Sequence, residues 1–180
     1  MFLKNCWYVA GWPSELQGEG VVTRRILDQP VLMYRNSANE PVAFLDRCPH
    51  RLVPLSAGQR IGDQLRCGYH GMVFGSDGRC VHIPGQETIP RNATATTIPV
   101  VERHGIVWIW MGNAAADADL IPDLPWPALP NWEPSYGYTH MAADYRLITD
   151  NLLDLSHETY IHQGTIGNKD EETHAEYTGQ

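Results

Sequence analysis

Two short stretches, CPHR at residues 48–51 and CGYHG at residues 67–71, constrain this chain more than any other feature. Each joins a cysteine to a histidine, as C-x-H and as C-x-x-H, and sixteen residues separate His50 from Cys67. Thiolate and imidazole groups bind zinc and iron–sulfur clusters, and two cysteines can also form a disulfide. The pattern leaves a disulfide, a zinc site, an iron–sulfur cluster or coincidence as alternatives.

Zinc held by two cysteines and two histidines is the simplest structural alternative. Its usual sites pair like ligands, as C-x2–4-C and H-x3–5-H, whereas each stretch here supplies one ligand of each kind. A Rieske [2Fe–2S] cluster needs these four ligands, because two cysteines hold one iron and two histidines hold the other. Pro49 stiffens the first stretch, and Gly68 and Gly71 permit tight turns beside a cluster. The spacing favours the cluster, with zinc as the alternative.

The composition limits the classes of protein to which the chain can belong. Of its 180 residues, 43% are hydrophobic and 19% are charged, which is typical of soluble globular proteins. No stretch approaches the roughly 20 apolar residues of a membrane span, and the N-terminal stretch does not resemble a signal peptide. A formal net charge of −8 disfavours nucleic-acid binding. We therefore predict a cytoplasmic protein that binds neither nucleic acid nor membrane.

The use of cysteine agrees with a metal site rather than with a disulfide framework. Disulfides are disfavoured in a reducing cytosol, where Cys/His clusters more often bind metal. Cys6 and Cys80 have no partner at ligand spacing, so we expect them to be small buried residues.

The chain divides into three segments that differ in amino-acid composition and in the pattern of apolar residues. Residues 1–113 contain short runs rich in β-branched and aromatic residues with turn signals between them, such as GSDG at residues 75–78, which predicts a mostly β domain of small antiparallel sheets or a barrel. Residues 114–134 are rich in proline, and Trp126 and Trp132 indicate a packed connection. Residues 135–180 begin with an expected strand at 136–146 and a helix at about 147–162, which is the α+β start of a second domain.

CPHR and CGYHG at this separation resemble the Rieske motif of the Rieske non-haem iron oxygenases. The resemblance implies that Cys48 and Cys67 bind one iron of the cluster. It likewise implies that His50 and His70 bind the other iron. Further stretches, including KNCWYVAGWPSEL and DYRLITDNLLDLSHETYIH, resemble the branch that contains vanillate O-demethylase and dicamba monooxygenase, and the likeness extends to about Lys169.

A second group of candidate ligands lies near the C-terminal end of the sequence. His157 and His162 are five residues apart and could face one side of a helix that loosens at its end. Taken alone they could equally be surface histidines, but two histidines and a carboxylate form the facial triad of non-haem Fe(II) oxygenases. Asp154 lies about one helical turn before His157 and could hydrogen-bond its ring.

The family resemblance assigns roles to these residues. The segment matches the pattern D-x-x-H-x4-H, which implies that His157 and His162 bind a mononuclear Fe(II). It implies that Asp154 links this iron to the Rieske cluster of a neighbouring subunit, and that Asn151 lies near the iron.

The resemblance also implies a function and partners. The expected activity is that of a terminal oxygenase component that O-demethylates or hydroxylates an aromatic acid such as vanillate, with O2 and electrons from an NAD(P)H-dependent flavin or iron–sulfur reductase. The complete protein is expected to be a homotrimer. The alternative is a Rieske electron-transfer module without oxygenase activity of its own.

One departure from the family pattern concerns the third ligand of the mononuclear iron. In the family this carboxylate comes from far downstream, whereas the acidic residues of the last segment match no ligand motif: Asp170, Glu171, Glu172 and Glu176. We therefore expect the sequence to be an N-terminal portion of an oxygenase subunit, and to be inactive as an oxygenase by itself.

Overall fold

The computed structural model describes residues 2–125, 129–162 and 164–165. The chain forms two compact units, Met1–Tyr136 and Gly137–Gln180. Of the sequence features singled out above, Trp126, Asp170, Glu171, Glu172 and Glu176 lie outside the described residues. No helix in the described part is long and apolar enough to cross a membrane.

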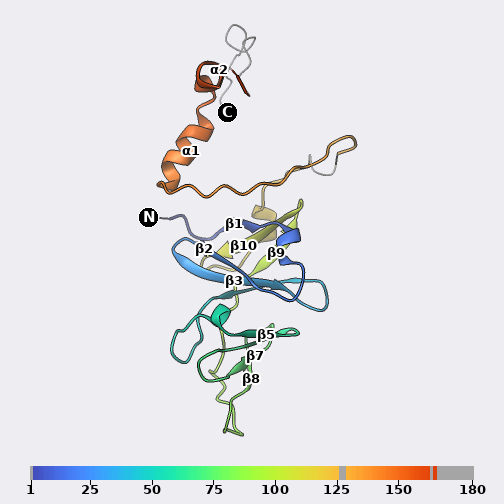
Figure 1. Cartoon of the computed structure of the whole chain (residues 1–180), viewed down its shortest axis with the longest axis vertical. Helices are drawn as coiled ribbons and strands as arrows, with labels where there is room; N and C mark the ends of the chain where they lie inside the picture. Colours follow the sequence, from blue (N-terminus) through green and yellow to red (C-terminus); the bar gives the residue numbers. More distant parts are fainter. Residues whose placement is uncertain (1, 126–128, 163, 166–180) are drawn as a thin grey trace. The chain divides into compact units, whose positions relative to one another are not determined.

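The first unit consists of three antiparallel sheets that follow one another along the unit (Figure 1). The first has the order β1-β10-β9, the second β2-β3-β4 and the third β5-β6-β7-β8. The strands are β1 (Cys6–Gly11), β2 (Val22–Ile26), β3 (Gln29–Arg35), β4 (Pro41–Leu45), β5 (Gln59–Ile61), β6 (Gln64–Arg66), β7 (Val73–Phe74), β8 (Cys80–His82), β9 (Val100–Arg103) and β10 (Ile106–Met111). The short 3-10 helices are η1 (Pro13–Leu16), η2 (Leu55–Ala57) and η3 (Ala118–Leu120). The expectation of a mostly β domain built from small antiparallel sheets is confirmed.

Strands β3 and β4 of the middle sheet are buried on both faces, whereas β2 alternates between half-buried and exposed residues. Successive side chains of a strand point to opposite sides, so the two faces of β3 contribute to different cores. On β3, Val31 and Met33 belong to the core shared with β1 and β10. Leu32 and Tyr34 belong to a separate core shared with the third sheet. A strand buried on both faces needs a continuous apolar run, which explains the sequence PVLMYR.

Tyr34 connects the middle sheet to the third sheet. It is fully buried, and its hydroxyl donates to the carbonyl oxygen of Asp63 at 2.7 Å, in the turn between β5 and β6. The guanidinium of Arg60 lies 4.6 Å from the centre of its ring and also donates to the carbonyl oxygen of Arg35. Burial raises the pKa of Tyr34 from 10.0 to about 12, so the hydroxyl stays a donor at neutral pH.

The segment that follows β10 is anchored to the first unit at several points. Ile121 is buried, the indole N–H of Trp7 donates to the carbonyl oxygen of Asp117, and the ring of Tyr136 packs against Trp12. Trp132, in contrast, is 63% exposed, so the packing that we expected of this side chain is not present within the first unit.

The strand expected at residues 136–146 does not form. Residues 135–143 have no regular structure, and α1 (Tyr145–Leu153) begins where the Asp144 side chain accepts a hydrogen bond from the backbone N–H of Arg146. A strand needs a neighbour to satisfy its backbone groups. Within the described residues, none pairs with this segment.

The helix expected at about residues 147–162 is interrupted. It consists of α1, the 3-10 turn η5 (Leu155–His157) and α2 (Glu158–Ile161). The break lies at Asp154, whose backbone is extended and whose carboxylate accepts hydrogen bonds from the backbone N–H and the hydroxyl of Ser156. This local bonding competes with helix continuation, as is common for aspartate.

Tyr34→Phe tests the connection between the middle and third sheets. We expect the loss of its hydrogen bond to lower the free energy of unfolding by about 1 kcal/mol near neutral pH. The pKa of Tyr34 is 10.0 in the unfolded chain and about 12 in the folded one, so the free energy of unfolding of the wild type falls as pH rises from 10 to 12. The variant has no hydroxyl at this position to ionise, so this contribution to the fall is absent from it. Urea unfolding below and within this pH range measures both effects. An identical pH dependence in the two proteins would contradict the shifted pKa.

Candidate metal centres

The two cysteine–histidine stretches form loops with the same backbone hydrogen bonds. We call residues 48–53 the first loop and residues 67–72 the second loop. In each loop, the N–H of the cysteine donates to the carbonyl oxygen of the last residue, Val53 or Met72, at 2.8 Å. The N–H of the residue four positions after the cysteine donates back to the cysteine carbonyl oxygen, at 2.9 Å in the first loop and 3.1 Å in the second. That residue is left-handed in both loops, with φ of 58° at Leu52 and 74° at Gly71.

The loops bury their thiols and expose their imidazoles. Cys48 and Cys67 are 1% and 2% exposed and belong to the core that the second and third sheets share. Burial raises the pKa of the Cys48 thiol, and the adjacent Cys67 raises it further. His50 and His70 lie at the surface with their Nδ1 atoms 3.2 Å apart. The structure therefore brings the thiols together on the inner side and the imidazoles together on the outer side.

This donor set fits a [2Fe–2S] cluster of the Rieske type. Such a cluster takes two thiolates at one iron and two imidazoles at the other, and the side chains present form one pair of each kind. All four cysteines of the chain lie among the described residues, and none forms a disulfide. In that described part, no group of three or more His, Cys, Asp or Glu side chains is arranged to hold a single metal ion.

Asp46, which the sequence analysis did not single out, closes the first loop. Its buried carboxylate accepts hydrogen bonds from the backbone N–H of Ser56 at 2.8 Å and from the Ser56 hydroxyl at 2.5 Å. The two residues flank the first loop, so this contact fixes the distance between its ends. An aspartate two residues before CPHR was visible in the sequence, but its partner ten residues onward was not.

Close backbone packing holds the start of the second loop against residues 57–58. A Cβ atom placed on Gly58 would lie 2.0 Å from the carbonyl oxygen of Arg66, and one on Gly68 would lie 2.8 Å from that of Ala57. Glycine at both positions therefore permits this close approach. Gly71 adopts the left-handed conformation that we expected of a tight turn.

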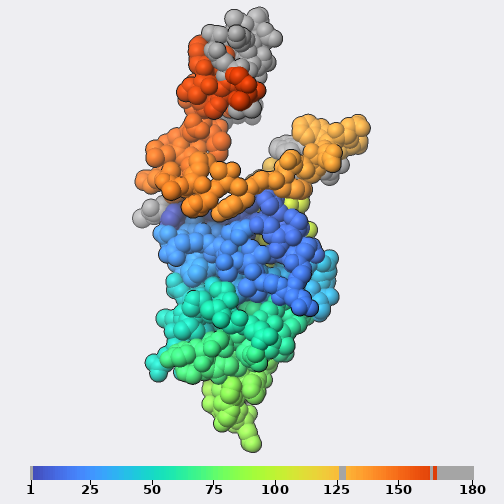
Figure 2. Space-filling model, viewed as in Figure 1, coloured from blue at the N-terminus to red at the C-terminus, as the bar shows by residue number. Residues whose placement is uncertain are grey.

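A pocket of 380 Å³ opens beside the two imidazoles. His50 and His70 form one side, and Met72, Pro84 and Asn92 are among the residues that line the rest. The segment that follows β8 supplies much of the wall and lies at the end of the first unit, where Figure 2 shows it in yellow-green. The ring of Tyr69 covers His70, with the ring centres 3.9 Å apart.

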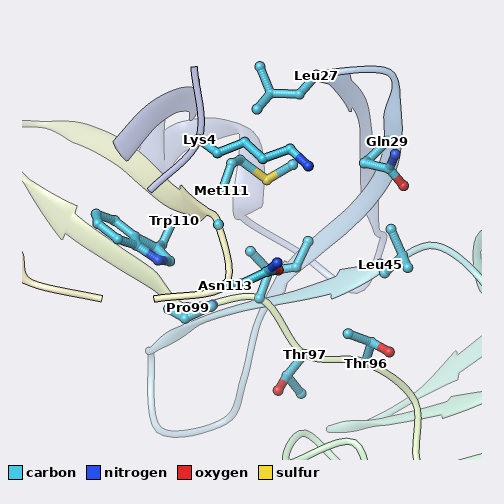
Figure 3. Close-up of a pocket in the computed structure, with 12 residues that line it drawn as sticks. Lys4, Leu27, Gln29, Leu45, Thr96, Thr97, Pro99, Trp110, Met111 and Asn113 are labelled. Atoms are coloured by element: carbon cyan, nitrogen blue, oxygen red, sulfur yellow. The ribbon is translucent and has the colours of Figure 1, made fainter. Parts of the chain in front are cut away.

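A second pocket, of 310 Å³, lies away from these ligands (Figure 3). It is lined by Lys4, Leu27, Trp110 and Asn113 among others, and Lys4 is its only charged lining residue. Its lining includes no His, Cys, Asp or Glu and none of the site residues predicted from the sequence. It is therefore separate from the cysteine–histidine centre.

The second unit brings His157 and His162 together. They lie at the two ends of α2, and their ring centres are 5.4 Å apart. Nδ1 of His157 is buried and has no hydrogen-bond partner. Two adjacent imidazoles, one with an unpaired buried nitrogen, fit two of the three protein ligands of a non-haem Fe(II) site.

Asn151 and Asp154 both lie beside His157. Nδ2 of Asn151 is 3.4 Å from Nε2 of His157. An oxygen of Asp154 is 3.8 Å from Nδ1 of His157, which is an ion-pair distance but too long for the hydrogen bond that we expected. The hydrogen bonds from Ser156 lower the pKa of Asp154, so its carboxylate is charged at neutral pH.

Comparison with known proteins agrees with this geometry. Residues 6–99 match the Rieske [2Fe-2S] domain, and residues 141–179 match the vanillate O-demethylase oxygenase C-terminal domain. The chain belongs to the Rieske oxygenase family. The family membership predicted from CPHR and CGYHG, and with it the [2Fe–2S] cofactor, is confirmed.

Several relatives of this Rieske oxygenase chain are oxygenase components. It is 48% identical over 168 residues to the iron–sulfur subunit of a toluene-4-sulfonate monooxygenase system from Comamonas testosteroni, covering 93% of this chain and 48% of that protein. It is 41% identical to a vanillate O-demethylase oxygenase subunit from a Pseudomonas species, covering 94% of this chain and 48% of that subunit. The chain thus spans about half the length of these curated relatives.

Solved structures of dicamba monooxygenase have the same fold. One with dicamba bound superposes with a TM-score of 0.88 at 40% identity, over 96% of this chain and 52% of that one. Another contains non-heme iron and dicamba, with a TM-score of 0.81 at 42% identity, over 87% of this chain and 48% of that one.

Asp46→Ala tests whether the bond to Ser56 holds the first loop. The change leaves the Ser56 N–H without its partner, so we expect the first unit to lose about 1–3 kcal/mol of stability and to retain less iron and sulfide. Asp77→Ala removes a carboxylate at an exposed turn and serves as the matched control. Iron and acid-labile sulfide per chain, together with thermal unfolding, measure the effect. A fully loaded and equally stable Asp46→Ala protein would show that the loop holds its shape without this contact.

Proposed function

We propose that the chain is part of the terminal oxygenase component of a Rieske monooxygenase that O-demethylates or hydroxylates an aromatic acid. Vanillate is the substrate that we favour. The observation that carries the proposal is the presence of two ligand sets on two units: the cysteine–histidine pairs on the first and the His157–His162 pair on the second. An electron-transfer module would need only the first set.

In this proposal, the ligands of the first unit have distinct roles. Cys48 and Cys67 would hold the inner iron. His50 and His70 would hold the outer iron through their Nδ1 atoms, which lie side by side at the surface. Neutral imidazoles in place of thiolates raise the reduction potential of such a cluster, which then accepts and donates single electrons.

The residues of the second unit would form most of a mononuclear iron site. His157 and His162 would be two of its ligands, with a carboxylate from further along the protein as the third. Asn151 would orient the ring of His157 through its 3.4 Å contact. Iron in such a site supplies O2 activation. The surrounding side chains orient the ligands and limit the access of water.

The overall reaction for a methoxy substrate balances with the partners that we propose. One O2 and two electrons with two protons, from NAD(P)H through a reductase, convert the methyl carbon to a hemiacetal and release one water. The hemiacetal then collapses to a phenol and formaldehyde. The similarity of the chain to a vanillate O-demethylase oxygenase subunit supports this chemistry.

We propose that electrons pass between subunits of a homotrimer, from His50 or His70 of one copy through Asp154 of another. Charge supports this pairing. Residues 47–95 hold six arginines and three carboxylates, a net charge of +3, whereas residues 137–180 hold two cations and eight carboxylates, a net charge of −6. Opposite charges favour the docking of one such surface on the other. The four free cysteines support a reducing, cytoplasmic location.

Formaldehyde release from vanillate, with reductase, NADH and Fe(II), tests the proposal. We expect these 180 residues alone to accept electrons without releasing formaldehyde, and a longer form with the downstream carboxylate to do both. Sustained release by the short form would mean that the third ligand lies within it. A longer form that is reduced but never consumes O2 with any aromatic acid would favour the electron-transfer module.

Asp154→Asn in the longer form tests the route between subunits. We expect turnover to fall by at least about 100-fold while the absorption spectrum of the cluster is unchanged, since only the charged bridge is lost. Asp150→Asn, an aspartate in the preceding turn of α1, is the matched control and should keep its activity. Normal turnover of the Asp154 variant would contradict the bridging role.

A further inference from the structure

Leu52 occupies a position that the twin loop fills with glycine. Both loops have a left-handed residue four positions after the cysteine, and in the second loop this residue is Gly71. A leucine with φ of 58° is strained, because its Cβ crowds the following carbonyl oxygen. Glycine would meet the same backbone requirement without this strain.

The packing of the Leu52 side chain within the described part of the first unit does little to offset the strain. Its side chain is 67% exposed and belongs to neither of the two buried cores. Strained residues cluster at functional sites, where the surrounding structure imposes their conformation. Since the Leu52 side chain contributes little to the interior, a function of this side chain would require a contact outside the unit.

The surroundings of Leu52 have the character of a docking surface. Leu52 lies two residues after His50 in the chain. Tyr69, which is 61% exposed, precedes His70, and its ring covers the ring of His70. Arg51, the residue before Leu52 in the first loop, is exposed and forms no ion pair with any carboxylate of the described residues. An exposed apolar side chain beside an uncompensated cation, in a segment of net positive charge, fits a partner that is apolar and acidic.

The second unit of another copy has this chemistry. Leu152, Leu153 and Ile161 are exposed on the helices that carry Asp154 and the histidine pair. The segment also has the net negative charge described above. It is therefore the occupant that best matches the surface around Leu52.

We infer that Leu52 is an anchor residue that packs against the second unit of another copy and excludes water from the junction around His50 and His70. The inference rests on the proposed transfer of electrons between subunits. Leu52 is a positioning residue in this role: it holds the partner against the imidazoles and ligates no metal itself.

The test compares Leu52→Gly and Leu52→Ala in the iron-loaded holoenzyme. Both variants remove the side chain, so both should raise the subunit concentration at which the oligomer dissociates roughly tenfold and slow reoxidation of the reduced cluster. Glycine also relieves the strained backbone, so the melting temperature of Leu52→Gly should exceed that of Leu52→Ala. The EPR spectrum and reduction potential of the cluster should not change in either variant.

Asn39→Gly is the matched backbone control. Asn39 is another exposed non-glycine residue with positive φ, at 64° in the turn between β3 and β4, and it lies outside both loops. Its replacement should alter neither subunit dissociation nor cluster reoxidation. Analytical ultracentrifugation and single-turnover absorption measurements give the two readouts.

Two results would overturn the role of Leu52 while leaving the proposed function intact. One is unchanged dissociation and reoxidation in both Leu52 variants. The other is slower reduction by the reductase with unchanged subunit association, which would assign the surface to the electron donor. A wild-type protein that transfers no electrons between subunits would instead overturn the proposed route, and this inference with it.

Discussion

The inward burial of two thiols beside the outward exposure of two imidazoles is the constraint on which the first unit depends. Cys48 and Cys67 are core residues as well as candidate ligands, so the second and third sheets must meet where the two loops begin. This explains why β3 is apolar on both faces and why Tyr34 reaches across to the turn between β5 and β6. A change in the packing of the core would therefore also change the separation of the ligands.

Much of the first unit could be predicted from the sequence because its signals are local. The two mixed cysteine–histidine stretches identified the family, and short β-branched runs with turns such as GSDG indicated the small sheets. The bond between Asp46 and Ser56 was not predictable, because neither residue marks the other as its partner. The left-handed Leu52 was equally hidden, since leucine gives no sequence signal for positive φ.

The second unit shows where local patterns mislead. Residues 136–146 were expected to form a strand, but a strand forms only with a partner, and the described residues supply none. The helical period continues through Asp154, yet its side chain bonds to Ser156 and ends α1. This break places His157 and His162 at the two ends of one short turn of helix, which a continuous helix would not do.

Because the thiols are buried and the imidazoles are exposed, a partner protein can reach the cluster site only from its imidazole side. Behind the cysteines lies packed hydrocarbon, including Leu32 and Phe44, which conducts poorly and keeps dissolved oxidants away from sulfur. In front lie the imidazole rings, with the aromatic face of Tyr69 against one of them. A bound cluster would therefore exchange electrons through its imidazole side. In an assembly in which another copy covers that side, an electron donor would have to approach the imidazoles at the edge of the contact.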